Sequence, residues 1–253
     1  VDKISMLTAA GMVGTVRYKH KSIKKSTKLG FEGLLVNSQG NRINLKELFF
    51  HKLDSKLIPK NLILVVVSGM NSGKTTSASK LIHGLTKDGM KVAACKLTGS
   101  VSNRDKNELY SASADHVIDF SDYGFPSTYL CKKEELMNLF KTMLSDIEKV
   151  SPDVIVMEIA DGILQRETKM LLTDKEVHNL TKGVILAAES APSALFSSSQ
   201  LQKWGYSVIA VSGAITSSPL SSQEFLENSE IQLISSAGSG TDLSKCVVNY
   251  IKK

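Results

Sequence analysis

An uninterrupted apolar run at residues 62–67 leads directly into a short glycine-containing segment, and this junction constrains the fold more than any other feature of the chain. The segment at residues 68–76 reads Ser68-Gly69-Met70-Asn71-Ser72-Gly73-Lys74-Thr75-Thr76. Beyond it, the spacing typical of one helix face links Ala78, Leu81, Ile82 and Leu85. A strand, a glycine-bearing loop, a Lys-Thr pair and a helix, in this order, build a phosphate-binding loop, or P-loop.

Each part of this segment has an expected role. Glycines let the backbone wrap around phosphate oxygens, Lys74 adds a positive charge beside the terminal phosphates, and Thr75 offers a hydroxyl to Mg²⁺. The helix that begins here directs its free N–H groups and positive dipole end at the same anion. Ser68 stands where the pattern has Gly, and the alternative is a Gly/Ser-rich turn that contains Lys-Thr by chance. The residues expected to hold the nucleotide are Gly69, Asn71, Ser72, Gly73, Lys74, Thr75 and Thr76.

From residue 60 onward, short apolar runs alternate with helix-sized segments, which is typical of an α/β protein. We predict a doubly wound, mostly parallel sheet with helices on both faces, in a P-loop nucleotide-binding domain at residues 60–253. Residues 1–59 have a different sequence pattern, in which period-two runs are broken by turn residues. This pattern predicts a small basic β-rich N-terminal domain. A short helix is expected near residues 45–50. The strands of the main sheet are expected at residues 62–67, 91–97, 116–120, 153–158, 183–187 and 207–211.

The composition indicates whether the chain folds into an ordered domain and in which cellular compartment we expect it. With 253 residues, 42% of them hydrophobic, and only 5 prolines, the chain is long enough for an ordered core. The longest apolar run is far shorter than a membrane span, and the first residues carry no signal-peptide pattern. The three cysteines, Cys95, Cys131 and Cys246, have no metal-type spacing and read as buried thiols in a reducing compartment. We therefore expect a cytoplasmic protein.

The net charge of +6 is concentrated at one end of the chain. Residues 1–60 hold 12 Lys and Arg against 4 Asp and Glu, most densely between Arg17 and Lys28. Such a stretch would attract an anionic substrate, a phosphate tail or a nucleic acid, or would be a solvated basic loop. No aromatic stacking platform accompanies it, so nucleic acid is not expected as a partner.

Polar residues that follow the other apolar runs are candidates for the same site, because ligands of doubly wound sheets bind where the strands end. Glu158 follows one such run, and Asp105 lies in the loop region after another. Carboxylates beside a P-loop hold Mg²⁺, so the expected metal ligands are Thr75, Asp105 and Glu158. Asp161 is a weaker candidate for the same role, and the alternatives are an acid that caps a turn and an acid on a loop surface.

The expected catalytic side chains are cationic. Lys96 ends an apolar strand, where a lysine needs a partner, and with Lys74 it would stabilise charge during phosphoryl transfer. Arg166 would contact the γ-phosphate, or would pair with Glu167 or Asp161 at the surface. The Asn/Thr-Lys-x-Asp element of Ras-type GTPases is absent, because Thr86-Lys87-Asp88 has the wrong spacing. The expected cofactors are ATP (or GTP) and Mg²⁺, with ATP favoured.

Three motifs together resemble the dethiobiotin synthetase-like (SIMIBI) branch of P-loop NTPases: the loop at residues 69–76, Lys96-Leu97-Thr98-Gly99, and Glu158-Ile159-Ala160-Asp161-Gly162. The Thr98-Gly99 element and the segments at residues 119–124, 127–129 and 165–168 are still more similar to a family of uncharacterised P-loop proteins that includes the D-glutamate N-acetyltransferases. That resemblance implies a small N-terminal domain, Mg²⁺ at Thr75, Asp105 and Glu158, and contacts from Lys74 and Lys96 to the nucleotide or a substrate carboxylate. Asp161 departs from the synthetase pattern, which has a small residue there.

These observations lead to one main hypothesis and two alternatives. The main hypothesis is a Mg²⁺-dependent, ATP-binding enzyme that activates a small acidic substrate by phosphoryl transfer, as a synthetase (ligase) or kinase does. One alternative is a CoA-dependent N-acyltransferase in which the P-loop binds the donor phosphates. The other is a nucleotide-binding adaptor or NTPase switch. The expected partners are the nucleotide and a small anionic substrate. Binding to a membrane is not expected, and a homodimer is one possible state.

Overall fold

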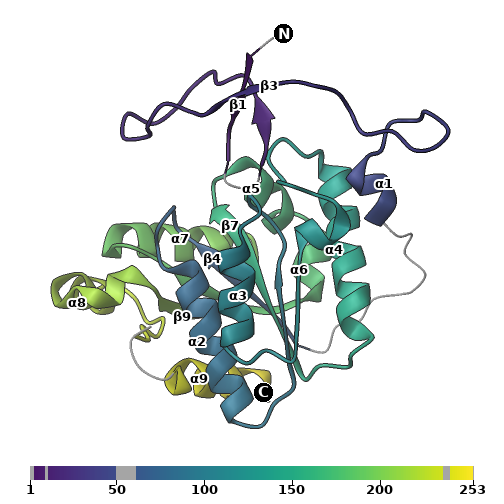
Figure 1. Cartoon of the computed structure of the whole chain (residues 1–253). Coiled ribbons are helices and arrows are strands. Elements are labelled where there is room, and N and C mark those ends of the chain that lie inside the picture. The colour runs from purple at the N-terminus through teal and green to yellow at the C-terminus, as the bar shows by residue number, and fades with distance from the viewer. Residues whose placement is uncertain (1–2, 9–10, 50–60, 236–239, 253) are drawn as a thin grey trace.

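The computed structural model describes residues 3–8, 11–49, 61–235 and 240–252, and its centre is strand β4, Leu62–Val67 (Figure 1). Every side chain of β4 is buried. A run without polar residues suits a central strand of a parallel sheet, because both of its faces are covered. The apolar run before the P-loop therefore forms the strand that the sequence predicts.

Five more strands complete a parallel sheet around β4 in the order β6-β5-β7-β4-β8-β9. All neighbouring pairs run parallel, so the carboxyl ends of the strands lie at one edge of the sheet. Strands β5 and β6 follow β4 in the chain and lie on one side of it, and β7 then inserts between β5 and β4. Strands β8 and β9 lie on the other side of β4. The strands are β5 Val92–Lys96, β6 His116–Asp119, β7 Val154–Gly162, β8 Thr181–Ala187 and β9 Val208–Ser212.

Helices cover both faces of this sheet, as the predicted α/β class requires. Leu64 faces a cluster with α4, α5, α6, α7 and α8, whereas Val65 faces a cluster with α2, α3 and α9. None of the helices in the described ranges combines the length and the apolar composition needed to cross a bilayer. The α-helices are α2 Lys74–Lys87, α3 Asn103–Ser111, α4 Lys133–Glu148, α5 Arg166–Leu172, α6 Lys175–Leu180, α7 Ala191–Lys203, α8 Pro219–Glu227 and α9 Thr241–Ile251, with 3₁₀ helices η1 Phe120–Tyr123 and η2 Ala214–Ser217.

The N-terminal segment forms a small antiparallel sheet, as predicted, in the order β2-β1-β3. Its strands are β1 Lys3–Met6, β2 Val13–Gly14 and β3 Lys28–Gly30, and helix α1, Leu45–Phe49, follows. None of its described large apolar side chains is buried. Lys46 joins α1 to α4 through an ion pair of 2.8 Å with Glu135. The predicted boundary between residues 59 and 60 falls outside the described residues.

Strand β7 is longer than predicted, and this changes the position of Glu158. The apolar pattern predicts a strand that closes at residue 158, but β7 continues to Gly162. Glu158 therefore lies inside the strand, where it pairs in register with Val65 of β4 and Lys96 of β5. Backbone pairing on both sides holds this carboxylate in the sheet despite its polarity. Asp105 also differs from its expected loop position, because it lies in the first turn of α3.

We expect Phe140→Ala to lower the free energy of unfolding by about 4 kcal/mol, because Phe140 is fully buried between α4 and the sheet. The matched control is Phe196→Ala on α7, whose side chain is 53% exposed and whose change should be about 0.5 kcal/mol or less. Urea denaturation monitored by circular dichroism measures both. Equal losses in the two variants would contradict the burial of Phe140 in the cluster on its face of the sheet.

Candidate functional site

The loop between β4 and α2 has the backbone geometry of a phosphate-binding loop. Gly73 is the N-terminal cap of α2 and adopts φ +86°, and Asn71 adopts φ +64°. These left-handed conformations turn the chain so that the first N–H groups of a 14-residue helix face the loop. The first turn of α2 carries no acidic residue that would oppose an anion there.

A second loop supports the P-loop from behind. The N–H of Ala214 donates a hydrogen bond of 3.0 Å to the Ser72 carbonyl. A Cβ atom at Gly213 would lie 2.2 Å from the same carbonyl oxygen, and Gly213 has φ +93°. Only glycine therefore permits this close approach. The end of β9 fixes the backbone of the P-loop in place.

The P-loop opens into a cleft of about 540 Å³. Polar residues from α3 and β7, namely Arg104, Asp105, Glu108 and Asp161, complete its lining. The structure thus places Asp105 beside the loop, as expected, together with all seven residues predicted to hold the nucleotide: Gly69, Asn71, Ser72, Gly73, Lys74, Thr75 and Thr76. Their role in binding a nucleotide stays a prediction.

At the base of this loop, the ammonium group of Lys74 lies 3.0 Å from Oε1 of Glu158. The Glu158 side chain is 1% exposed and that of Lys74 is 17% exposed. Apart from this ion pair, no described residue donates a hydrogen bond to either carboxylate oxygen of Glu158. A buried carboxylate without hydrogen-bond donors is costly, so the Lys74 charge is its main compensation.

A second ion pair joins Lys96, the last residue of β5, to Asp105. The Lys96 side chain is almost fully buried, and its ammonium lies 5.9 Å from the centre of the Phe120 ring. Next to it, Thr98 accepts a hydrogen bond of 2.8 Å from the Ala160 N–H and so fastens β7 to the end of β5. The Thr-Gly element that follows β5 therefore has a structural role in holding β7.

The residues present fit a Mg²⁺ ion only if phosphate oxygens are also supplied. Among the described residues, no three His, Cys, Asp or Glu side chains gather into a metal cluster. Thr75 lines the cleft, and Asp105 lines it with Lys96 as its partner. Glu158 and Lys96 are not among the lining residues, but Glu158 offers buried oxygens without hydrogen bonds directly behind Lys74. Mg²⁺ commonly takes one or two protein oxygens together with substrate phosphates, which matches this donor set.

Arg166 is not among the residues that line the P-loop cleft. Its guanidinium forms an ion pair with Glu167, the surface alternative considered for it, and its side chain is half-exposed. Glu167 is buried and also accepts a hydrogen bond of 2.9 Å from the Leu130 N–H. In this structure Arg166 therefore pairs with its neighbour on α5, and a contact from it to the γ-phosphate stays a prediction.

Glu189 was not among the predicted site residues, although it directly contacts the P-loop. Its carboxylate accepts hydrogen bonds from the hydroxyl groups of Ser68 and, at 2.7 Å, of Ser72. This contact gives Ser68 a role that glycine could not fill. Burial alone would raise the pKa of Glu189, but the hydrogen bonds from Ser68 and Ser72 lower it overall. The sequence does contain a pattern that points to Glu189, because Glu189 follows the apolar run of β8 as Glu158 follows the apolar run at the start of β7.

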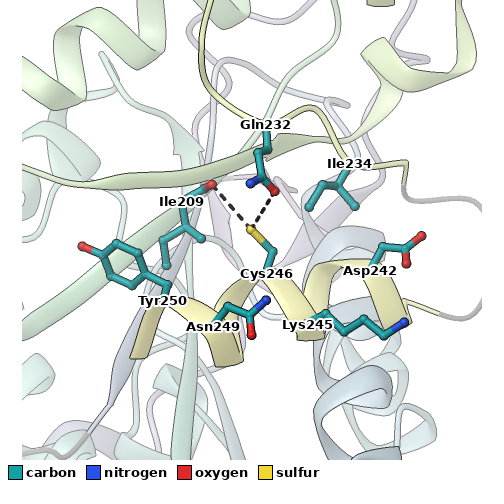
Figure 2. Close-up of a pocket in the computed structure, with 8 residues that line it drawn as sticks. All are labelled: Ile209, Gln232, Ile234, Asp242, Lys245, Cys246, Asn249 and Tyr250. Atoms are coloured by element: carbon teal, nitrogen blue, oxygen red, sulfur yellow. Dashed lines mark hydrogen bonds between the residues drawn. The ribbon is translucent and has the colours of Figure 1, made fainter. Parts of the chain in front are cut away.

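Another cleft, of about 370 Å³, lies along α9 and contains Cys246 (Figure 2). The Cys246 thiol points toward the side-chain oxygen of Gln232 at 3.3 Å and the Ile209 carbonyl at 3.7 Å. Burial raises the pKa of this thiol, so it stays protonated and is a poor nucleophile. Cys95 and Cys131 are buried, as predicted, whereas Cys246 is only partly buried. Burial also raises the thiol pKa values of Cys95 and Cys131. The P-loop cleft is the stronger candidate for a functional site.

The sequence matches no protein-family model and no curated protein. Among solved structures it is similar to chloroplast FtsY from Physcomitrella patens, with a TM-score of 0.51, 11% identity, and coverage of 83% of this chain and 72% of that chain. The chain shares its fold with FtsY. FtsY from Elizabethkingia anophelis in complex with GDP gives a TM-score of 0.49 at 15% identity, covering 83% of this chain and 70% of that chain. The kinase domain of Escherichia coli tyrosine kinase ETK gives 0.43 at 16% identity, covering 60% and 66%.

This similarity concerns the fold alone, and it confirms the predicted α/β class with a parallel sheet. It does not single out the dethiobiotin synthetase-like branch, so that narrower assignment stays a prediction.

We expect Glu189→Gln to lower the free energy of unfolding by about 1 kcal/mol at pH 7, because hydrogen bonds to a charged group are lost at an exposed site. The folded-state pKa of Glu189 lies below its ordinary value, so this stabilisation is complete above the ordinary carboxyl pKa. It is lost as the pH falls through the lowered pKa. Denaturation of wild type and variant between pH 3 and pH 8 measures the difference.

The control is Glu224→Gln on α8, an exposed residue that should change stability by no more than about 0.5 kcal/mol at any pH. A wild-type advantage over Glu189→Gln that grows as the pH falls would contradict the assigned hydrogen bonds.

Proposed function

We propose that the protein binds ATP and Mg²⁺ in the P-loop cleft and transfers the γ-phosphoryl group to an anionic oxygen of a small acidic substrate. The observation that carries this proposal is the Lys74–Glu158 pair, in which a P-loop lysine compensates a buried carboxylate that has no other hydrogen-bond donor among the described residues. Such an arrangement is costly in free energy unless a ligand uses it.

Different residues of the cleft would bind different parts of the nucleotide and the metal ion. The loop N–H groups and Lys74 would hold the β- and γ-phosphates, and the α2 N-terminus would add its dipole. Mg²⁺, held by phosphate oxygens with Thr75 and Glu158, would supply charge neutralisation on the transferred group. Glu158 would keep Lys74 oriented toward the phosphates.

The transfer step needs positioning more than covalent chemistry from the protein. A carboxylate oxygen of the substrate would form a bond to the γ-phosphorus while the bond from that phosphorus to the β–γ bridging oxygen breaks. The products would be an acyl phosphate and ADP, and no proton needs to move in this step. Lys96 stands at the neighbouring strand end, where its charge would stabilise the transferring group once Asp105 shares it with the ligand.

ATP is proposed over GTP because the Asn/Thr-Lys-x-Asp element is absent from the sequence. Thr86 and Lys87 lie in the last turn of α2, and Asp88 caps that helix. This part of the chain is therefore helical and lies at the end of α2 away from the P-loop.

Thermal unfolding with a panel of ATP, GTP and acetyl-CoA, each with and without Mg²⁺, tests the proposal. A ligand at about 100-fold excess over its Kd should stabilise the wild type by about 2.7 kcal/mol, and we expect this from Mg²⁺–ATP. Lys74→Ala should abolish the ATP shift, whereas Lys87→Ala, at an exposed position of the same helix, should retain it.

Because Lys74→Ala leaves Glu158 buried and unpaired, the double variant Lys74→Ala/Glu158→Gln serves as a second test that avoids an isolated charge. An undiminished ATP shift in both variants would contradict the proposal. A shift with acetyl-CoA and none with a nucleotide would replace it with the acyltransferase alternative.

A further inference from the structure

A third and larger cleft, of about 1060 Å³, lies between the N-terminal sheet and the carboxyl ends of the main strands. Figure 1 shows β1 and β3 at the same end of the molecule as α5, which follows β7. Gly99, Ser100 and Leu130 line the cleft from the main domain. Asp161 lines both this cleft and the P-loop cleft, so the two cavities meet at that residue. A ligand here would lie next to a bound nucleotide.

The charge of this cleft is strongly positive. Arg17, Lys19, Lys24 and Lys25 contribute to its lining, and Asp161 is the one acidic residue among the described residues that line it. The basic stretch of the N-terminal segment therefore faces a cavity beside the P-loop. A cleft with one sign of charge attracts ligands of the opposite sign and raises their local concentration.

The same cleft also presents apolar surface that the fold leaves open. Met6, Leu7 and Met12 line it together with Ile23, whose side chain is 58% exposed, and Leu130, which is 64% exposed. Clustered open apolar side chains around a cavity are typical of a ligand site, whereas isolated ones are common on any surface. The lining therefore has one part suited to an apolar body and another suited to an anion.

We propose that this cleft binds an amphipathic organic acid, with its apolar body against Met6, Leu7 and Ile23 and its acidic group among Lys19, Lys24 and Lys25. This inference rests on the proposed function and names the class of the acceptor substrate. The N-terminal segment thus forms one wall of the substrate site, which explains why it adds a basic, apolar-faced sheet without a core of its own. A single-stranded nucleic acid would use the same charges and would stack bases on Tyr18 and Tyr129, which also line the cleft, but it would leave Met6, Leu7 and Ile23 unmatched.

The probes are octanoate, its uncharged analogue 1-octanol, and succinate, which has charge without an apolar chain. Isothermal titration calorimetry on the full chain should show octanoate binding most tightly. Lys24→Glu/Lys25→Glu should weaken octanoate by about 10-fold or more, which corresponds to about 1.4 kcal/mol. Ile23→Ser should weaken it by about 5-fold, because a half-exposed apolar side chain is removed.

The matched control is Lys182→Glu/Lys203→Glu, which reverses two exposed lysines that do not line the cleft and should leave octanoate affinity within about 2-fold of wild type. Thermal shift with Mg²⁺–ATP is measured on every variant. An ATP shift that persists in Lys24→Glu/Lys25→Glu while octanoate binding falls supports the inference.

Three results would overturn the inference while leaving the proposed function intact: succinate or 1-octanol binding as tightly as octanoate, equal octanoate affinity in the charge-reversed and control variants, or a single-stranded oligothymidylate displacing octanoate at lower concentration. If Mg²⁺–ATP does not stabilise the wild type against thermal unfolding, the proposed function is refuted instead. The two failures are therefore distinguishable.

Discussion

The ion pair between Lys74 and Glu158 connects the phosphate-binding loop to the interior of the sheet, and the rest of the site depends on it. Lys74 is the first residue of α2, and Glu158 lies inside β7, directly beside the loop-bearing strand β4. The pair exists because the sheet order places β7 between β5 and β4. Burial makes the carboxylate depend on the lysine, and so fixes the lysine at the loop.

Residues that follow strands β8 and β9 also form hydrogen bonds with the P-loop. Glu189 after β8 accepts hydrogen bonds from Ser68 and Ser72, and Ala214 after β9 donates one to the Ser72 carbonyl. Contacts from β7, β8 and β9 thus converge on one short segment. A loop held on three sides is organised before any ligand arrives, which lowers the entropy lost on binding.

Much of this architecture could be predicted from the sequence because the responsible signals are local. The apolar run of β4, the glycine loop and the period of α2 occupy one continuous stretch, and alternating runs and helices predict the parallel sheet. The extension of β7 beyond Glu158 could not be predicted, because a carboxylate normally ends an apolar strand and only pairing with β4 and β5 keeps it inside.

Contacts between distant residues account for the other differences. Glu189 lies more than 110 residues beyond the P-loop, and only the adjacency of β4 and β8 brings it to Ser68. In the N-terminal segment, where period-two runs predict a β-rich domain, strand β2 is limited to Val13–Gly14, and Val36 forms only an isolated bridge with Arg42. Such short strands depend on a partner surface more than on their own pattern.

The role of the Lys74–Glu158 pair is tested by the dependence of ATP affinity on Mg²⁺ concentration in the wild type and in Glu158→Gln, measured by calorimetry. If Glu158 orients Lys74 and supports the metal, Mg²⁺ should raise the ATP affinity of the wild type by about 10-fold or more, a coupling of about 1.4 kcal/mol. In Glu158→Gln most of this enhancement should disappear, while metal-free affinity stays within about 3-fold of wild type. An equal enhancement by Mg²⁺ in both proteins would contradict the central role given to the Lys74–Glu158 pair.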